Sequence, residues 1–226
     1  MVHRFPIDPG TLSRETPVRF PGPSGRLEGL WRPPRPESDP RGTVVVAHPH
    51  PQYGGTMLNK VVFHVARTLN HDLDAASLRF NFRGVGHSEG VYDAANGETG
   101  DVAAAWTEAR RRVPGKPLIA AGFSFGAACT LRAAALPPPP EPPRVLILVG
   151  TPVDLFEPPY PLPRDLPLIA VHGERDPYTP PSRVREFTKR WPGPVAFRVE
   201  PGADHFLEGR LVEAVRFLSE AAGRWL

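Results

Sequence analysis

Short apolar runs alternate with longer helix-forming segments along most of the chain. The first such run, Thr43 to Ala47, is continuously apolar and rich in β-branched residues, as in a strand that is buried on both faces. Asn59 can then cap a helix that has Val62, Val65 and Leu69 at helical spacing. Strands that alternate with helices predict a parallel sheet with helices on both faces and right-handed crossovers between strands.

The same alternation continues to the C-terminus. We expect further strands at 76–80, 118–122, 145–150, 168–173 and 195–200, and further helices at 102–112, 125–135, 182–190 and 209–225. At the front, Val18 to Pro21 and Leu27 to Trp31 flank turn-forming residues, which predicts a hairpin. The predicted fold class is therefore α/β: a doubly wound, mostly parallel sheet with an antiparallel N-terminal hairpin. A length of 226 residues suits a single domain over 1–226, with an irregular segment at 1–16.

The connection between the strands at 145–150 and 168–173 is short and rich in proline. Proline interrupts helices and stiffens loops. A lid domain therefore does not fit in this connection, and we expect an open cleft.

The overall charge gives little reason to expect a nucleic-acid partner. The net charge is +3, and the 27 lysines and arginines are scattered except for a run at Arg110 to Arg112. Positive charge at this position suits the solvated end of a helix. Cys129 is the single cysteine, so an internal disulfide is impossible. The sequence has neither a signal-peptide pattern nor a long apolar stretch, so we predict a cytoplasmic protein that does not associate with membranes.

Gly122-Phe123-Ser124-Phe125-Gly126 follows an apolar strand and precedes a helix-forming run. This is the context of a nucleophile elbow, in which a sharp turn exposes a serine hydroxyl and small flanking residues avoid backbone collisions. The following helix N-terminus also stabilises negative charge that develops nearby. We therefore predict that Ser124 is a nucleophile.

A serine hydroxyl needs a base to take its proton. Among eight histidines, His205 lies in the loop after the last expected strand, and this loop opens at the carboxyl edge of the sheet where ligands bind. His48, His50 and His172 also stand near strand ends and are the competing candidates. We predict that His205 is the base.

A carboxylate should orient the imidazole and stabilise its protonated form. Asp176 follows the strand at 168–173 and is the preferred candidate. Asp154, which follows the preceding expected strand, is the main alternative, and Glu174 stays open. Asp204 adjoins His205 in sequence and is poorly placed to face its ring.

These segments resemble the α/β-hydrolase superfamily, and most closely the small bacterial serine hydrolases related to dienelactone hydrolase and serine aminopeptidase-like proteins. The similarity runs from about Val44 to the C-terminus. It rests on the segments HPHP at 48–51, NFRGVGHSEG at 81–90, GFSFG at 122–126, HGERD at 172–176 and GADHF at 202–206. The resemblance implies the α/β-hydrolase fold and a Ser124, Asp176 and His205 triad, but it does not specify a substrate.

Acyl transfer needs hydrogen-bond donors where the carbonyl oxygen becomes negative. One expected donor is the backbone amide of Phe125, directly after the nucleophile. The other should come from the loop after the strand at 43–47, where Pro49 and Pro51 have no N–H. We predict the amide of His50 as the second donor, with Tyr53 as the alternative.

Together these residues predict a serine hydrolase that cleaves short-chain carboxylic esters through an acyl-enzyme on Ser124. Tyr53 and Phe123 are expected as walls of the substrate pocket. The partner is a small-molecule ester, no cofactor is needed, and His48-x-His50 lacks the further ligands of a metal site. A peptidase or amidase with the same triad and a non-catalytic binding protein stay as alternatives, and the oligomeric state stays open.

Overall fold

The computed structural model describes residues 14–35, 39–135, 142–156 and 161–226. The strands are β1 Thr16–Gly22, β2 Gly25–Arg32, β3 Thr43–Ala47, β4 Ala76–Phe80, β5 Leu118–Phe123, β6 Val145–Val149, β7 Leu168–Gly173 and β8 Val195–Glu200. The helices are α2 Lys60–Asp72, α3 Asn96–Arg112, α4 Phe125–Ala135, α5 Pro181–Lys189 and α6 Leu211–Ala222, with short 3₁₀ turns η1 Pro51–Tyr53 and η2 Gly223–Trp225. Within these ranges, a helix with the length and apolar character of a bilayer span does not occur. The predicted irregular segment at 1–16 lies mostly outside the described residues.

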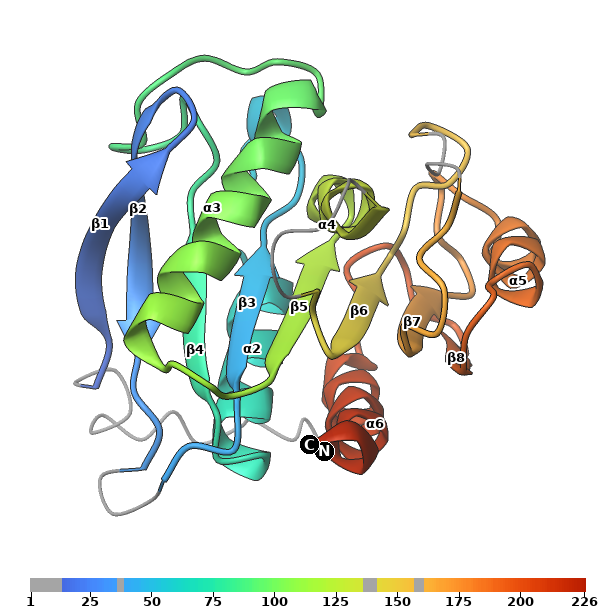
Figure 1. Ribbon diagram of the computed structural model, residues 1–226. Helices are drawn as coiled ribbons and strands as arrows, with labels where there is room; N and C mark the ends of the chain where they lie inside the picture. The colour runs from blue at the N-terminus through green and yellow to red at the C-terminus, as the bar shows by residue number, and fades with distance from the viewer. Residues whose placement is uncertain (1–13, 36–38, 136–141, 157–160) are drawn as a thin grey trace.

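In the described part of the chain, the eight strands form one sheet in the order β1-β2-β4-β3-β5-β6-β7-β8 (Figure 1). β1 pairs antiparallel with β2, and β2 pairs antiparallel with β4. All the other neighbouring strands run parallel. The predicted fold class, a mostly parallel sheet with an antiparallel hairpin at the front, is confirmed.

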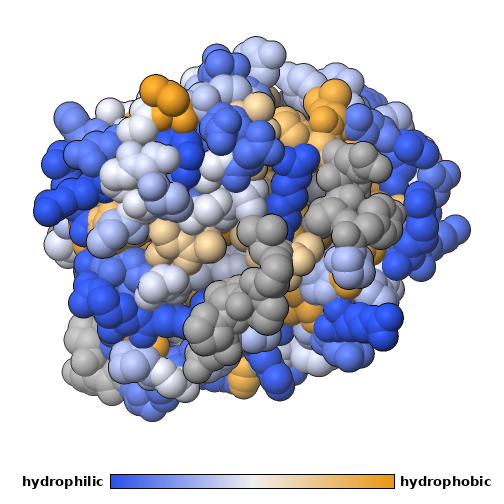
Figure 2. Space-filling model, turned by 45° about the horizontal axis from the view of Figure 1, so that its top comes forward, coloured by the Kyte–Doolittle hydropathy of each residue, from blue (hydrophilic) through white to orange (hydrophobic). Residues whose placement is uncertain are grey.

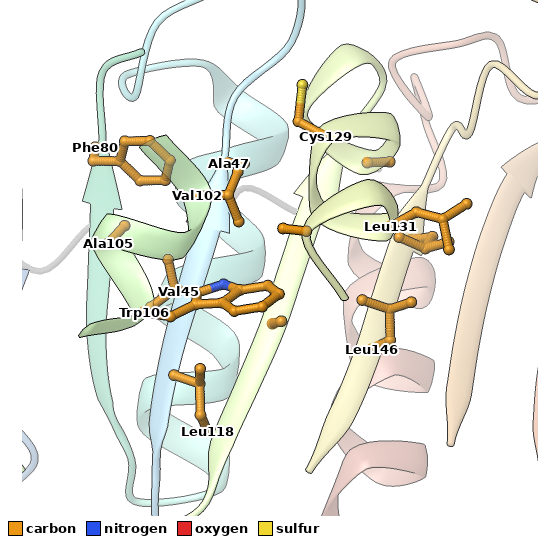
Figure 3. Close-up of a cluster of buried hydrophobic side chains, with 14 of the residues drawn as sticks. Val45, Ala47, Phe80, Val102, Ala105, Trp106, Leu118, Cys129, Leu131 and Leu146 are labelled. Atoms are coloured by element: carbon orange, nitrogen blue, oxygen red, sulfur yellow. The ribbon is translucent and has the colours of Figure 1, made fainter. Parts of the chain in front are cut away.

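Helices cover both faces of the sheet. Each central strand contributes side chains to two separate hydrophobic cores, one on each face. In β3, Val44 and Val46 belong to the core beneath α2 and α6, whereas Val45 and Ala47 belong to the core beneath α3 and α4. Figure 3 shows the second core, in which the indole of Trp106 lies over the sheet near Val45. Because both faces are buried, the strand reads as continuously apolar rather than alternating.

One boundary differs clearly from the sequence expectation. The helix predicted from 102 begins at Asn96, although its end at Arg112 is as expected. The buried carboxylate of Glu98 accepts hydrogen bonds from the amides of Asp93 at 2.8 Å and Ala95 at 2.9 Å, which closes the first turn. The Gly- and Asn-rich composition of this turn suggests a loop, and a tertiary setting that buries Glu98 overrides that local preference.

The connection between β6 and β7 begins at the carboxyl edge of the parallel strands. Between β6 and β7, the described residues at 150–156 and 161–167 contain neither a helix nor a strand, as expected for a fold without a lid domain. The loops after β3, β5, β7 and β8 lie at the carboxyl edge of the sheet (Figure 1). Ligands of open α/β sheets bind at this edge.

Candidate active site

Ser124 stands in the sharp turn between β5 and α4. Its φ of +56° lies in the left-handed region, which costs a non-glycine residue about 1–3 kcal/mol. A Cβ atom at Gly122 would lie 2.3 Å from the carbonyl oxygen of Gly126, and one at Gly126 would lie 2.5 Å from that of Ala47. Both glycines are therefore required for the close backbone approach that makes the turn. The hydroxyl is left at the N-terminus of α4, where negative charge is stabilised.

Ser124, His205 and Asp176 form one continuous chain of hydrogen bonds. Oγ of Ser124 lies 2.9 Å from Nε2 of His205, and Nδ1 of His205 lies 2.6 Å from Oδ2 of Asp176. Because an ionised carboxylate only accepts hydrogen bonds, Nδ1 carries the hydrogen and Nε2 presents its lone pair to the hydroxyl. The fold thus brings together three side chains separated by 81 and 29 residues, in an arrangement that can activate a hydroxyl.

The carboxylate of Asp176 is buried and bonded through both oxygens. Its Oδ1 accepts hydrogen bonds from the amides of Tyr178 at 2.9 Å and Thr179 at 3.2 Å. Burial by itself raises the pKa of Asp176, but the hydrogen bond from His205 and the other interactions more than offset it. The net pKa is lowered. Asp176 therefore stays ionised and fixes the orientation of the imidazole.

His172 supports the turn that carries the acid. Its fully buried Nε2 lies 2.7 Å from the carbonyl oxygen of Thr179 and 3.4 Å from Oδ2 of Asp176. Since a carbonyl only accepts, Nε2 carries the hydrogen, and burial lowers the pKa of the ring so that it stays neutral. The sequence indicates His172 as a candidate base, but its contacts are with the turn of the acid. Its position at the end of β7 is the only sequence signal of this role.

The three competing carboxylates are engaged elsewhere. Asp154 accepts a hydrogen bond from Nε of Arg183 at 2.8 Å. Glu174 accepts one from the amide of Gly202 at 2.7 Å. Asp204 bonds to amides two and four residues further along its own turn. Asp176 is the carboxylate that meets His205.

Aromatic rings surround the imidazole of His205. Phe123, Tyr178 and Phe206 have ring centroids 5.0, 4.7 and 5.5 Å from it. Phe123 was expected as a pocket wall, but it is fully buried and packs against His205 inside the protein, because it belongs to a central strand. The sequence did not indicate that Gly150 contacts the imidazole. A Cβ at this position would lie 3.2 Å from Cε1 of His205, so the absence of a side chain leaves room for the ring.

Phe125 directly follows Ser124, and the ring centroid of His50 lies 4.8 Å from that of Phe125. Within the described ranges, the amides of Phe125 and His50 donate no hydrogen bond to another residue. The amide of Tyr53, the alternative donor, is already bonded to the carbonyl oxygen of His50 at 3.1 Å, and its side chain is 87% exposed. This arrangement favours His50 over Tyr53 as the partner of Phe125 in binding an oxyanion.

Neither histidine of the His48-x-His50 pattern is placed as a metal ligand. In His48, Nδ1 lies 2.6 Å from the carbonyl oxygen of Pro49, and Nε2 accepts a hydrogen bond from the amide of Phe82 at 3.1 Å. In His50, Nδ1 accepts a hydrogen bond from the amide of Gln52, and Nε2 is hydrogen-bonded to the hydroxyl of Tyr92. Among the residues described, His, Cys, Asp and Glu side chains form no group of three suited to a metal ion.

Ser124 and His205 open into a cavity of about 460 Å³. This volume is in the range of small-molecule sites. Its walls come from the loops after β3, β5, β6, β7 and β8, and they are mostly apolar. The described lining residues are Pro49, His50, Tyr53, Gly54, Gly55, Asn59, Ser124, Phe125, Pro152, Leu155, Phe156, Tyr178, His205 and Phe206.

The sheet order, together with a serine in the strand-to-helix turn, is the architecture of an alpha/beta hydrolase. A family model described as alpha/beta hydrolase fold matches residues 50–170, which is more than half of the chain. The chain belongs to this family, as the sequence resemblance predicts.

Similar proteins agree with this assignment. An α/β serine hydrolase without a lid from Xanthomonas campestris is 31% identical, with 98% of each chain covered and a TM-score of 0.82. A serine hydrolase homologue from Coxiella burnetii is 35% identical, over 91% of this chain and 96% of the other, with a TM-score of 0.80. An uncharacterized protein of Rickettsia prowazekii is 29% identical over 90% of this chain and 87% of its own. These likenesses support a hydrolase.

Proposed function

We propose that this protein is a serine hydrolase of the carboxylesterase type, which cleaves short-chain carboxylic esters through an acyl-enzyme on Ser124. The observation that carries the proposal is the chain of hydrogen bonds from Ser124 through His205 to Asp176. The serine hydrolases among its relatives lend it further support.

In the first half of the reaction, Oγ of Ser124 attacks the carbonyl carbon of the ester while its proton passes to Nε2 of His205. The carbonyl π electrons move to the oxygen, and the amides of Phe125 and His50 donate hydrogen bonds to the resulting oxyanion. When the intermediate collapses, the bond to the alcohol oxygen breaks. The departing alcohol takes the proton from His205, and Asp176 stabilises the imidazolium in the meantime.

In the second half, water attacks the acyl carbon and gives a proton to His205. Collapse of the second intermediate breaks the bond to Oγ, and the proton returns to Ser124. The products are one alcohol and one carboxylic acid, so the atoms balance with water as the only co-reactant.

The cavity also bears on the alternatives. An aminopeptidase needs an acidic group for the substrate amine, and none of the fourteen described lining residues is Asp or Glu. A binding protein would have no need for a strained serine with φ of +56° that faces an oriented imidazole. The first feature favours an esterase over an aminopeptidase, and the second favours an enzyme over a binding protein.

The test compares p-nitrophenyl acetate and butyrate with an aminoacyl anilide. We expect hydrolysis of both esters, faster than of the anilide. The Ser124→Ala variant should lose at least about a thousandfold in kcat, because the nucleophile is absent. The control is Ser182→Ala, which makes the same change at an exposed position on α5. Undiminished ester hydrolysis by Ser124→Ala would refute the mechanism, and faster anilide cleavage would point to an amidase.

A further inference from the structure

More than half of the large exposed apolar side chains among the described residues lie at the cavity of Ser124. Seven large apolar side chains are exposed, and four of them, Tyr53, Leu155, Tyr178 and Phe206, line this cavity. Figure 2 brings the carboxyl edge of the sheet forward and shows apolar patches set in a mostly hydrophilic surface. Apolar surface concentrated at a pocket mouth marks a site for an apolar ligand.

The cavity also lacks a partner for a charged substrate. None of the fourteen described lining residues is Asp, Glu, Lys or Arg. Burial lowers the pKa of His50, which favours the neutral form of its ring. Its Nδ1 accepts a hydrogen bond from the amide of Gln52 at 3.3 Å, so Nε2 carries the hydrogen and donates it to the hydroxyl of Tyr92 at 3.1 Å. A charged group in this cavity would lose hydration without a counter-charge.

One side of the cavity is a set of rings, which we name the aromatic wall: His50, Tyr53 and Phe156. The ring of Phe125 is fully buried and supports His50 and Phe156. The centroid of His50 lies 4.7 Å from that of Tyr53, 4.8 Å from that of Phe125 and 6.4 Å from that of Phe156. Phe125 and Phe156 meet edge to face at 5.3 Å. A planar ring in the substrate can add to such a set through edge and face contacts that a saturated ring cannot make.

The position of His205 indicates which side of the cavity holds the alcohol and which holds the acyl group. His205 must deliver its proton to the alcohol oxygen, so the alcohol lies against His205. Tyr178 and Phe206 are the cavity residues that pack on this imidazole, and they flank the alcohol. The oxyanion points to the amides of Phe125 and His50, which leaves the aromatic wall for the acyl group.

We propose that the preferred substrates are uncharged esters of carboxylic acids that carry an aromatic ring, with this acyl ring packed on the aromatic wall. This inference rests on the proposed function and adds the acyl class to it. It also assigns Phe156 as a residue that determines specificity.

The test uses two esters that differ only in the aromatic character of the acyl ring: methyl 3-phenylpropanoate and methyl 3-cyclohexylpropanoate. Their carbonyl groups are equally reactive because two methylene groups insulate them from the ring. The saturated ring has at least as much apolar surface, so burial alone does not favour the phenyl ester. We expect kcat/KM to be about threefold to tenfold higher for the phenyl ester.

Variants of the cavity residues test which side chains cause the preference for the phenyl ester. Phe156→Leu and Tyr53→Leu keep apolar side chains and should bring this phenyl-to-cyclohexyl ratio close to one. The matched control, Phe217→Leu on α6, lies outside the cavity and should leave the ratio unchanged. A second pair, benzyl and cyclohexylmethyl propanoate, places the ring on the alcohol, where Phe156→Leu should leave the ratio unchanged and Tyr178→Leu should lower it. Ratios within one preparation do not depend on the folded fraction.

A wild-type ratio of one or less, or a ratio that Phe156→Leu does not change, would overturn the inference. A response of the benzyl pair to Phe156→Leu would reverse the assignment of the two ends. These failures differ from failure of the proposed function. If p-nitrophenyl acetate is hydrolysed by Ser124 and the aromatic preference is absent, only the acyl class is wrong.

Discussion

Stability should fall steeply as the solution is acidified from neutral pH, and His48 should account for much of the fall. This side chain is fully buried, and it links the loops that follow β3 and β4 through Pro49 and Phe82. Burial lowers the pKa of His48 from 6.5 to about 4. In the unfolded chain the same ring is hydrated and protonates near its ordinary value.

The sign and size of the effect follow from proton binding. Between about pH 6.5 and pH 4, the unfolded chain binds a proton at His48 that the folded protein does not, so the free energy of unfolding falls as the pH falls. Over the full window the loss is about 3 kcal/mol, and between about pH 7 and pH 5 it is about 2 kcal/mol. The pKa of Asp176 is lowered by folding. Asp176 therefore lowers the free energy of unfolding further only in more acidic solution, below the pKa of an aspartate in the unfolded chain.

Urea denaturation at these two pH values measures the difference directly. The His48→Gln variant keeps an acceptor for the amide of Phe82 but cannot titrate. Whatever its absolute stability, it should show a pH difference about 2 kcal/mol smaller than the wild type. His87→Gln makes the same change at an exposed site and is the control. An unchanged pH dependence in His48→Gln would show that His48 is not held neutral by burial.

Two further changes test the packing around the site. Gly150→Ala should lower kcat for p-nitrophenyl acetate by about tenfold or more. The new Cβ would lie 3.2 Å from Cε1 of His205, and φ of Gly150 is +55°. An unchanged kcat would contradict this reasoning. Arg83→Met should cost about 3–5 kcal/mol in urea denaturation, because it leaves the buried carboxylate of Asp101 without the guanidinium that now lies 2.7 Å away. A loss below about 1 kcal/mol would show that Asp101 is protonated or hydrated once Arg83 is removed.

Most strands and helices follow from local patterns that have a direct physical cause. The β-branched run of β3 and the cap at Asn59 define their elements within a few residues of the chain. Oδ1 of Asn59 accepts a hydrogen bond from the amide of Val61 at 2.9 Å, as the capping pattern predicts. The start of α3 was predicted wrongly, because the hydrogen bonds that stabilise its first turn depend on the burial of Glu98.

The active-site residues divide in the same way, into those that the local sequence predicts and those that only the folded structure identifies. The pattern around Ser124 predicts the turn because strand, glycines and helix lie together in the chain. His205 and Asp176 were chosen by their place after β8 and β7, with Asp154 and Glu174 left open. Only folding shows that Asp154 pairs with Arg183 while Asp176 meets His205, since both carboxylates follow a strand in the sequence.

By itself, the sequence determined the alternation of strands and helices, the serine turn and the small set of residues that compete for the site. These depend on neighbours within a few positions, where backbone geometry and side-chain spacing act directly. The tertiary structure alone decided the supporting roles of His172 and Gly150, the buried place of Phe123 and the rings that form the aromatic wall. These features arise where distant loops meet at one edge of the sheet, and such meetings depend on the packing of the whole fold.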